Sequence, residues 1–294
     1  MQVATSLFYD RSSTALTTLS GRADLLQTQI ATGKRLAKAS DDSVAYTRLQ
    51  TIARATADAS VDGKNLDLAA SALATADTTL SGITAQLQRA SELAIQARSG
   101  TLDATAREAI AAELDTIVDQ LTALGNGSDP RGQPLFGGVD GGPAVAKNTD
   151  GTFTLATTLP SAIPIGEGQT VQPGDTAVRV FGSGANNALA TVAGLAAALH
   201  GGGAASAQAV DDLAAAATRV TTVQASLGAR AARVEVEQAA LKQTGADREA
   251  LRSGLEDTDV TAAITELQKT MTILSATQAS FTKLQGLSLF DYLR

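Results

Sequence analysis

Two sites in this 294-residue chain hold residue types that could carry acid–base chemistry. His200 is the only histidine, and the three glycines after it predict a solvated loop residue. A histidine without a second histidine or a cysteine is a poor indication of a metal or catalytic site. Asp41 and Asp42 are adjacent carboxylates, but neighbours at a helix start point in different directions and do not share a proton. This pair favours helix capping instead.

Sequence motifs for phosphate binding and hydrolysis are incomplete or missing. Gly182-Ser183-Gly184 resembles a fragment of a phosphate loop, but no Gly-Lys-Ser/Thr follows it. The chain has neither a Gly-x-Ser-x-Gly elbow nor a His-Glu-x-x-His pair. It also has no cysteine, which excludes disulfides, thiolate metal sites and cysteine nucleophiles. We therefore expect no catalytic residue, metal site or cofactor, and an enzyme is the last of the alternatives.

The composition is typical of long helices packed side by side. Aromatic residues make up only 3% of the chain and tryptophan is absent, so the apolar content is mostly Ala, Leu, Val and Ile. The net charge of −7, without a cluster of Lys and Arg, argues against nucleic acid as a partner. Neither a cleaved secretory signal nor a membrane-spanning stretch is expected.

The C-terminal segment carries an apolar stripe at coiled-coil spacing. Val260, Ile264, Leu267, Met271, Leu274 and Phe281 are separated by four, three, four, three and seven residues. Ser, Thr, Ala, Gln and Lys surround them, so the apolar face is narrow. Such a helix requires partner helices with the same period.

The N-terminal segment carries a matching stripe. Its members are Leu16, Leu19, Ala23, Leu26 and Ile30. Gly33 and the Lys34–Arg35 pair interrupt it, and Ser40, Asp41 or Asp42 can cap the helix that follows.

Helical periodicity dominates the rest of the chain outside the middle. A long helix is predicted from about Ser43 to Arg98, with an unbroken 3.5-residue repeat from Leu66 to Ala97. Thr105 and Glu108 have capping-box spacing and predict the start of another helix. A third helical pattern runs from Val210 through Val234 to Leu251 and Leu255.

The middle of the chain changes character. Gly, Pro and Thr become dense from about Gln133 to Gly184, and Asp150-Gly151 is a hairpin signal. Phe153, Leu155 and Leu159 nearly alternate, as do Val178 and Val180, which predicts a small β insert. Ala188 to Leu199 predicts a short helix.

These patterns predict a mainly α fold in which long antiparallel helices form a coiled coil or bundle around a small β-rich insert. The expected divisions are an N-terminal assembly helix (1–40), two halves of a helical rod (41–132 and 186–255), an outer β-rich domain (133–185) and a C-terminal assembly helix (256–294). From spacing alone, the terminal stripes could be seams of a self-contained bundle or surfaces that neighbouring copies complete. A terminal helix joined through Gly33 favours assembly.

Several motifs in these segments resemble the bacterial flagellin superfamily, and particularly its members at the hook–filament junction. The carrying stretches are Thr32-Gly33-Lys34-Arg35 with Ser40-Asp41-Asp42, Ser99-Gly100-Thr101-Leu102, Gln278-Ala279-Ser280-Phe281, and Gln285-Gly286-Leu287-Ser288-Leu289-Phe290. The resemblance covers about residues 1–140 and 205–294. The junction-type signature usually has proline where this chain has Ala39 and Ser43, so a filament flagellin stays open as an alternative.

The resemblance implies a structural, extracellular subunit of the flagellum that polymerises through its terminal helices. Its partners would be further copies in a ring, the other hook-associated junction protein, flagellin, the flagellar type III export apparatus and an export chaperone. The terminal helices would be disordered in the monomer, and neither nucleic acid binding nor membrane insertion is expected. The expected assembly residues are Leu16, Leu19, Leu26, Ile30, Val260, Ile264, Leu267, Met271, Leu274, Phe281, Leu287, Leu289 and Phe290. A flagellin-like surface adhesin or glycan-binding protein is a further alternative.

Overall fold

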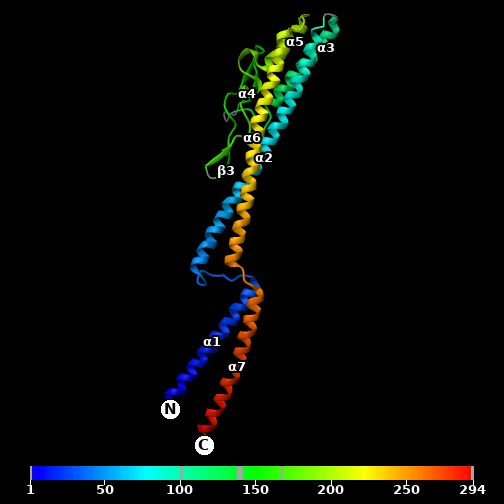
Figure 1. Ribbon diagram of the computed structural model, residues 1–294. Helices are drawn as coiled ribbons and strands as arrows, with labels where there is room; N and C mark the ends of the chain where they lie inside the picture. Colours follow the sequence, from blue (N-terminus) through cyan, green and yellow to red (C-terminus); the bar gives the residue numbers. More distant parts are fainter. Residues whose placement is uncertain (1, 100–101, 138–141, 167, 293–294) are drawn as a thin grey trace. The chain divides into compact units, whose positions relative to one another are not determined.

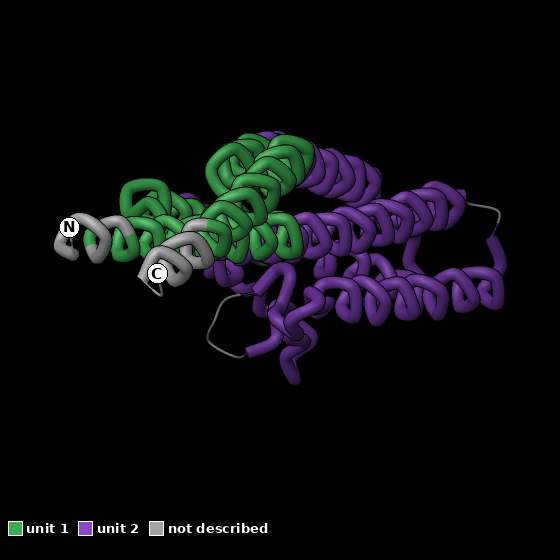
Figure 2. The backbone as a smooth tube through the Cα atoms, turned by 90° about the horizontal axis from the view of Figure 1, so that it is seen from below, with its two compact units in different colours: residues 1–56, 244–294 green, residues 57–243 purple. Residues whose placement is uncertain are grey.

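The computed structural model describes residues 2–99, 102–137, 142–166 and 168–292 (Figure 1). These residues form two compact units, one of residues 57–243 and one of residues 1–56 with 244–294 (Figure 2). Helices α2 (Ser43–Ala97) and α6 (Ala207–Glu256) contribute residues to both units.

The unit of residues 57–243 is a helical bundle. Within it, α2 runs antiparallel to α6, because Gln238 donates to Asp67 and Gln224 donates to Ser81. Helix α3 (Ala104–Gly125) returns along α2, where Arg89 Nε lies 2.7 Å from Glu113 Oε1. Helix α5 (Ala188–His200) packs along α3. The mainly α fold with antiparallel long helices is therefore confirmed.

The 3.5-residue repeat of α2 forms the centre of this bundle. Among the predicted positions, Ala70 is half-buried and the others are buried: Leu66, Leu73, Ala76, Leu80, Ile83, Leu87, Ala90, Ala94 and Ala97. On α6, Leu213, Val220, Val223, Leu227 and Val234 are buried as well. Alanines in these seams let helices approach closely, which accounts for a core with few aromatic rings.

The helical pattern predicted through Leu251 and Leu255 is confirmed by α6, but Leu251 does not belong to this core. Its side chain is 61% exposed, and Leu255 is half-buried. Both lie in the unit of residues 1–56 and 244–294, where Ala45 is the buried residue of α2. The physical reason is that the repeat marks a continuous face of α6, whereas burial requires facing side chains along all of it.

The predicted β insert consists of two antiparallel hairpins. Strands β1 (Val145–Lys147) and β2 (Phe153–Leu155) pair with Val145 opposite Leu155, and β3 (Ile163–Gly166) pairs with β4 (Gln169–Val171). Asp150 accepts from the Thr152 amide and Gly151 has φ of 82°, so the turn signal is confirmed. Leu159 lies outside the strands and is 46% exposed.

Two local predictions are wrong, one for the end of the insert and one for the residue that caps α3. Val178 and Val180 lie in a short helix, α4 (Ala177–Phe181), because Thr176 caps it by accepting from the Arg179 amide. A 3₁₀ turn, η1 (Gly184–Asn186), follows it. Helix α3 is capped by Asp103, which accepts from the Ala106 amide at 2.7 Å, rather than by Thr105.

The adjacent residues Asp41 and Asp42 accept hydrogen bonds from different backbone amides at the start of α2. Asp42 accepts from the Val44 and Ala45 amides and so caps the helix. Asp41 accepts from the Lys38 and Ala37 amides instead, and these backbone bonds lower its pKa. The capping prediction is thus confirmed for Asp42, while Asp41 closes the turn before the helix.

Buried charges fix the insert to α6. Asp175 is fully buried and lies 2.9 Å from Arg179 Nη1 and 3.4 Å from Arg230 Nη2. Arg230 also donates to the carbonyls of Gly174 and Gln172. Since each carbonyl and carboxylate here has a donor, the buried charge is compensated.

Candidate functional site

The terminal helices α1 (Gln2–Thr32) and α7 (Val260–Tyr292) pack side by side in antiparallel directions (Figure 1). Arg22 lies 2.8 Å from Glu266, and the rings of Tyr9 and Phe281 meet edge to face with centroids 5.6 Å apart. Because both members of the ion pair are exposed, the charge contributes little, and the apolar seam holds the pair.

The predicted stripe of α1 faces this seam. Ala23 is 4% exposed and Leu26 is 9% exposed, while Leu16, Leu19 and Ile30 are half-buried. The less exposed residues of α1 therefore follow the predicted spacing.

The stripe of α7 is only partly used within the chain. Leu267, Leu274 and Phe281 are half-buried, and the alternate seam positions are Ala263 and Thr270, at 7% and 2% exposure. The other predicted residues, Val260, Ile264 and Met271, are 41–44% exposed. Ala263 and Thr270 therefore face α1 in place of the predicted Ile264 and Met271. Val260, Ile264 and Met271 form a flanking apolar stripe that α1 leaves uncovered.

Three further predicted assembly residues lie outside the side chains that the structure describes. Leu287, Leu289 and Phe290 lie beyond the part of α7 whose side chains the structure describes. Their role in assembly stays a prediction, as it does for the rest of the set.

A short joint connects the ends of the terminal helices. Gly33 has φ of 70° and its carbonyl accepts from Thr258, while the Arg35 amide donates to the Glu256 carbonyl. The Glu256 carboxylate pairs with Lys34 and Arg252, and hydrogen bonding from Lys34 is the main cause of its lowered pKa. Gly33 and Lys34 stand out in the sequence as the break after the first helix, whereas Glu256 was not predicted; the adjacent acids Glu256-Asp257 were a possible signal for a cationic partner.

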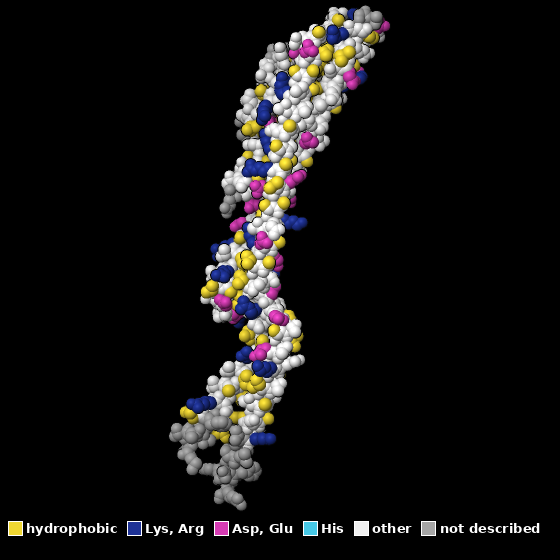
Figure 3. Space-filling view, in the orientation of Figure 1, with side chains coloured by type: hydrophobic (Ala, Val, Ile, Leu, Met, Phe, Trp, Pro, Cys, Tyr) yellow, Lys and Arg dark blue, Asp and Glu magenta, His cyan; other side chains and the backbone are white. Residues whose placement is uncertain are grey.

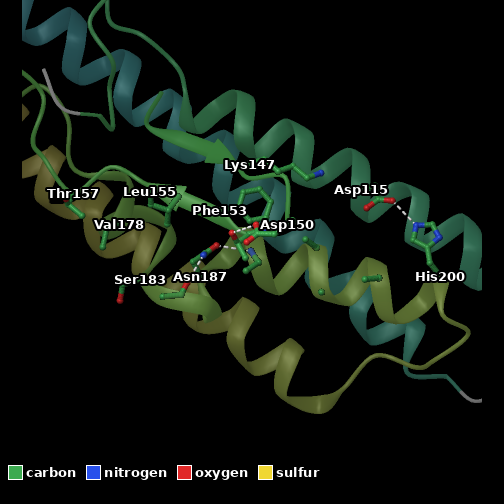
Figure 4. Close-up of a pocket in the computed structure, with 17 residues that line it drawn as sticks. Asp115, Lys147, Asp150, Phe153, Leu155, Thr157, Val178, Ser183, Asn187 and His200 are labelled. Atoms are coloured by element: carbon green, nitrogen blue, oxygen red, sulfur yellow. Dashed lines mark hydrogen bonds and ion pairs between the residues drawn. The ribbon is translucent and has the colours of Figure 1, made fainter. Parts of the chain in front are cut away.

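A groove of about 920 Å³ in the other unit lies between the β1–β2 hairpin and α5 (Figure 4). Phe153, Leu155 and alanines of α5 line it, with Lys147 and Asp150 also contributing. His200 and Asp115 lie together at one end (Figure 4). Within the described ranges, no group of three or more His, Asp or Glu is arranged to hold a metal ion.

His200 is not the free loop residue that its sequence context predicts. It ends α5, with Nε2 2.9 Å from Asp115 Oδ2 and Nδ1 3.0 Å from both carboxylate oxygens of Glu108. Asp115 and Glu108 are seven residues apart on α3, two helical turns, so both reach the same ring. Hydrogen bonding to Asp115, and next to Glu108, raises the pKa of His200. When the ring is protonated, each of its nitrogens donates to one of these carboxylates.

This cluster predicts a pH-dependent contribution to stability. Because the folded pKa of His200 lies above its ordinary value near 6.5, the contribution is complete below that pH and is lost as pH rises through the folded pKa. The excess melting temperature of the wild type over His200→Gln should be larger at pH 6 than at pH 8.5. An equal difference at the two pH values would contradict the ion-pair assignment.

Gly182-Ser183-Gly184 forms the turn between α4 and η1. Gly182 and Gly184 have φ of 95° and 72°, and a Cβ on Gly182 would lie 2.7 Å from Arg219 Nη1. The glycines therefore serve the turn and the close approach of Arg219.

The two ends of the chain match the two helical regions of one family. The model of the bacterial flagellin N-terminal helical region matches residues 9–140, and that of the C-terminal helical region matches residues 209–293. The chain belongs to the bacterial flagellin family. This match confirms the resemblance predicted from the terminal motifs, and the four strands of the insert lie between the two matched regions.

Relatives similar over the full length carry one name. The chain is 26% identical to flagellar hook-associated protein 3 of Salmonella typhimurium and 27% identical to that of Escherichia coli. Each alignment covers 99% of this chain and 99% of the relative. A flagellar junction protein from Legionella pneumophila shares the fold, with a TM-score of 0.59 and 15% identity over 71% of this chain and 100% of its own. The predicted structural role in the flagellum is confirmed by these matches. No helix in the described ranges is long and apolar enough to cross a membrane.

Proposed function

We propose that this chain is a structural adaptor at the junction between the flagellar hook and filament, and that it polymerises through α1 and α7. The observation that carries the proposal is full-length similarity to proteins named flagellar hook-associated protein 3, together with the uncovered stripe on α7. A filament flagellin was the alternative, and the names of the full-length relatives favour the junction role.

Exposure of the α7 stripe supports polymerisation. Val260, Ile264 and Met271 lose water only if another molecule covers them, and burial contributes about 25 cal/mol per Å² of apolar surface. Leu7 and Leu25 of α1 are also about half exposed, at 51% and 49%. Hydrophobic side chains remain visible at the surface elsewhere along the molecule (Figure 3). In this proposal, neighbouring copies in a ring cover these stripes.

The proposal divides the chain as its sequence predicts, with assembly helices at 1–40 and 256–294, a rod of 41–132 and 186–255, and an outward insert at 133–185. The partners would be the other hook-associated junction protein, flagellin, the type III export apparatus and an export chaperone. The subunit would act outside the cell without catalysis. His200, held between two carboxylates, suits packing of α3 against α5.

Deletion of the gene tests this role. We expect hooks without filaments and flagellin released into the medium. Exported filament subunits would find no junction surface on which to polymerise. Re-expression of the full chain should restore the filaments. Normal filaments in the deletion strain would contradict the junction role, and long filaments formed by the purified chain alone would identify a filament subunit instead.

A further inference from the structure

An apolar groove lies between the first turns of α2 and the last turns of α6, within the unit of residues 1–56 and 244–294. We call it the Arg48 groove, and its volume is about 700 Å³. Its lining residues are Ser43, Val44, Thr47, Arg48, Thr51, Ile52, Leu251 and Leu255. Val44 is 64% exposed and Leu251 is 61% exposed, so two large apolar side chains face solvent beside one another. Neighbouring exposed apolar side chains of this kind mark an interaction surface.

The charge at this groove is unpaired. Arg48 is exposed and has no ion pair or hydrogen bond from its side chain to any residue that the structure describes. The nearby Arg252, in contrast, is paired with both Glu249 and Glu256. An apolar groove with one free guanidinium fits a convex apolar residue beside a carboxylate, since a covered arginine needs an anionic partner.

This chain carries a surface of that chemistry on α6. Val236 is 67% exposed, the highest value among the exposed large hydrophobic residues described. Glu235 and Glu237 adjoin it, and their carboxylates likewise have no ion-pair partner in the described part of the chain. We call these three residues the Val236 ridge. It presents one apolar side chain between two free negative charges.

We propose that the Arg48 groove of one copy receives the Val236 ridge of the next copy. Val236 would cover Val44 and Leu251, and Arg48 would pair with Glu235 or Glu237. Groove and ridge are different surfaces, so the contact is head to tail and repeats from copy to copy, as a ring requires. This inference rests on the proposed function, because it names one lateral contact of the polymer.

The absence of cysteine allows a direct test by disulfide cross-linking. A chain carrying both Val44→Cys and Val236→Cys would have only those two thiols. In flagella isolated from cells that make it, mild oxidation should produce a ladder of covalent dimers, trimers and larger species. An equal mixture of the two single variants should stop at dimers, because each copy then has one thiol. Disulfides form only when the Cβ atoms approach to about 4 Å, so the readout reports contact rather than proximity.

Charge variants test the electrostatic part of the contact. Arg48→Glu should reduce the ladder about tenfold, and adding Glu235→Arg with Glu237→Arg should restore it. Asp58→Arg, beside Val61 at 57% exposure, is the matched control and should restore nothing. Rescue by the Asp58 variant would overturn the assignment of the ridge.

The outcomes separate this contact from the proposed function. Cells that swim normally with the double-cysteine chain present in their flagella, but that give no ladder, would refute the contact and leave the junction role intact. Covalent dimers from Val236→Cys alone would also refute it, since they indicate a two-fold interface. Absence of the chain from isolated flagella would refute the junction role itself.

Discussion

Met271→Asp should abolish assembly and leave the isolated chain folded. Met271 is 44% exposed and stands on the uncovered side of α7, so an aspartate there remains hydrated in the monomer. In the polymer that we propose, it would place an unpaired charge in an apolar interface. Such a charge costs about 3–5 kcal/mol, or about two to four orders of magnitude in affinity. Filament number per cell should fall to near that of the deletion strain, while the melting temperature of the purified chain should stay unchanged.

Ala276→Asp is the matched control for this variant. Residue 276 is exposed and, by helical spacing, lies on the side of α7 away from both Met271 and the seam with α1. This variant should keep normal filament numbers. Leu267→Asp and Phe281→Asp should also block assembly, but their side chains are half-buried in the α1 seam and would weaken that pairing too. Normal filament numbers with Met271→Asp would contradict the assignment of the uncovered α7 stripe to the interface between copies.

Phe181→Ala should cause a large loss of stability in the unit of residues 57–243. Phe181 is fully buried, and a Cβ on Gly125 would lie 3.0 Å from Phe181 Cε2 and 2.6 Å from Val145 Cγ2. Phe181 therefore packs where α3, α4 and β1 meet, and its removal leaves a cavity. The expected cost is about 3–5 kcal/mol in the free energy of unfolding, measured by urea titration.

Leu159→Ala provides the comparison for this loss. Leu159 lies in the same insert but is 46% exposed, so its truncation should cost less than about 1 kcal/mol. Equal losses for the two variants would show that the insert is not held by the Phe181 contact.

The long helices follow from the sequence because their signals are local. The repeat from Leu66 to Ala97 places apolar side chains on one face through bonds that each turn makes with the next. Asp42 caps α2 by accepting from the Val44 amide, and Gly151 allows the hairpin turn through its φ of 82°. Both signals act within a few residues of the chain. The terminal motifs likewise indicated the family before any fold was known.

Only the tertiary structure decided which faces are covered. Spacing treats Ile264 and Ala263 as neighbours on one helix, and only the packing of α1 against α7 shows that Ala263 is the buried one. His200 depends on carboxylates 85 and 92 residues away in the chain, which no local pattern connects with it. Val178 lies in helix α4 rather than in a strand, because Thr176 caps that helix and Val180 and Phe181 are buried. Periodicity records contacts between successive turns of one element, whereas burial and pairing depend on which elements meet, and that is set by packing of the whole chain.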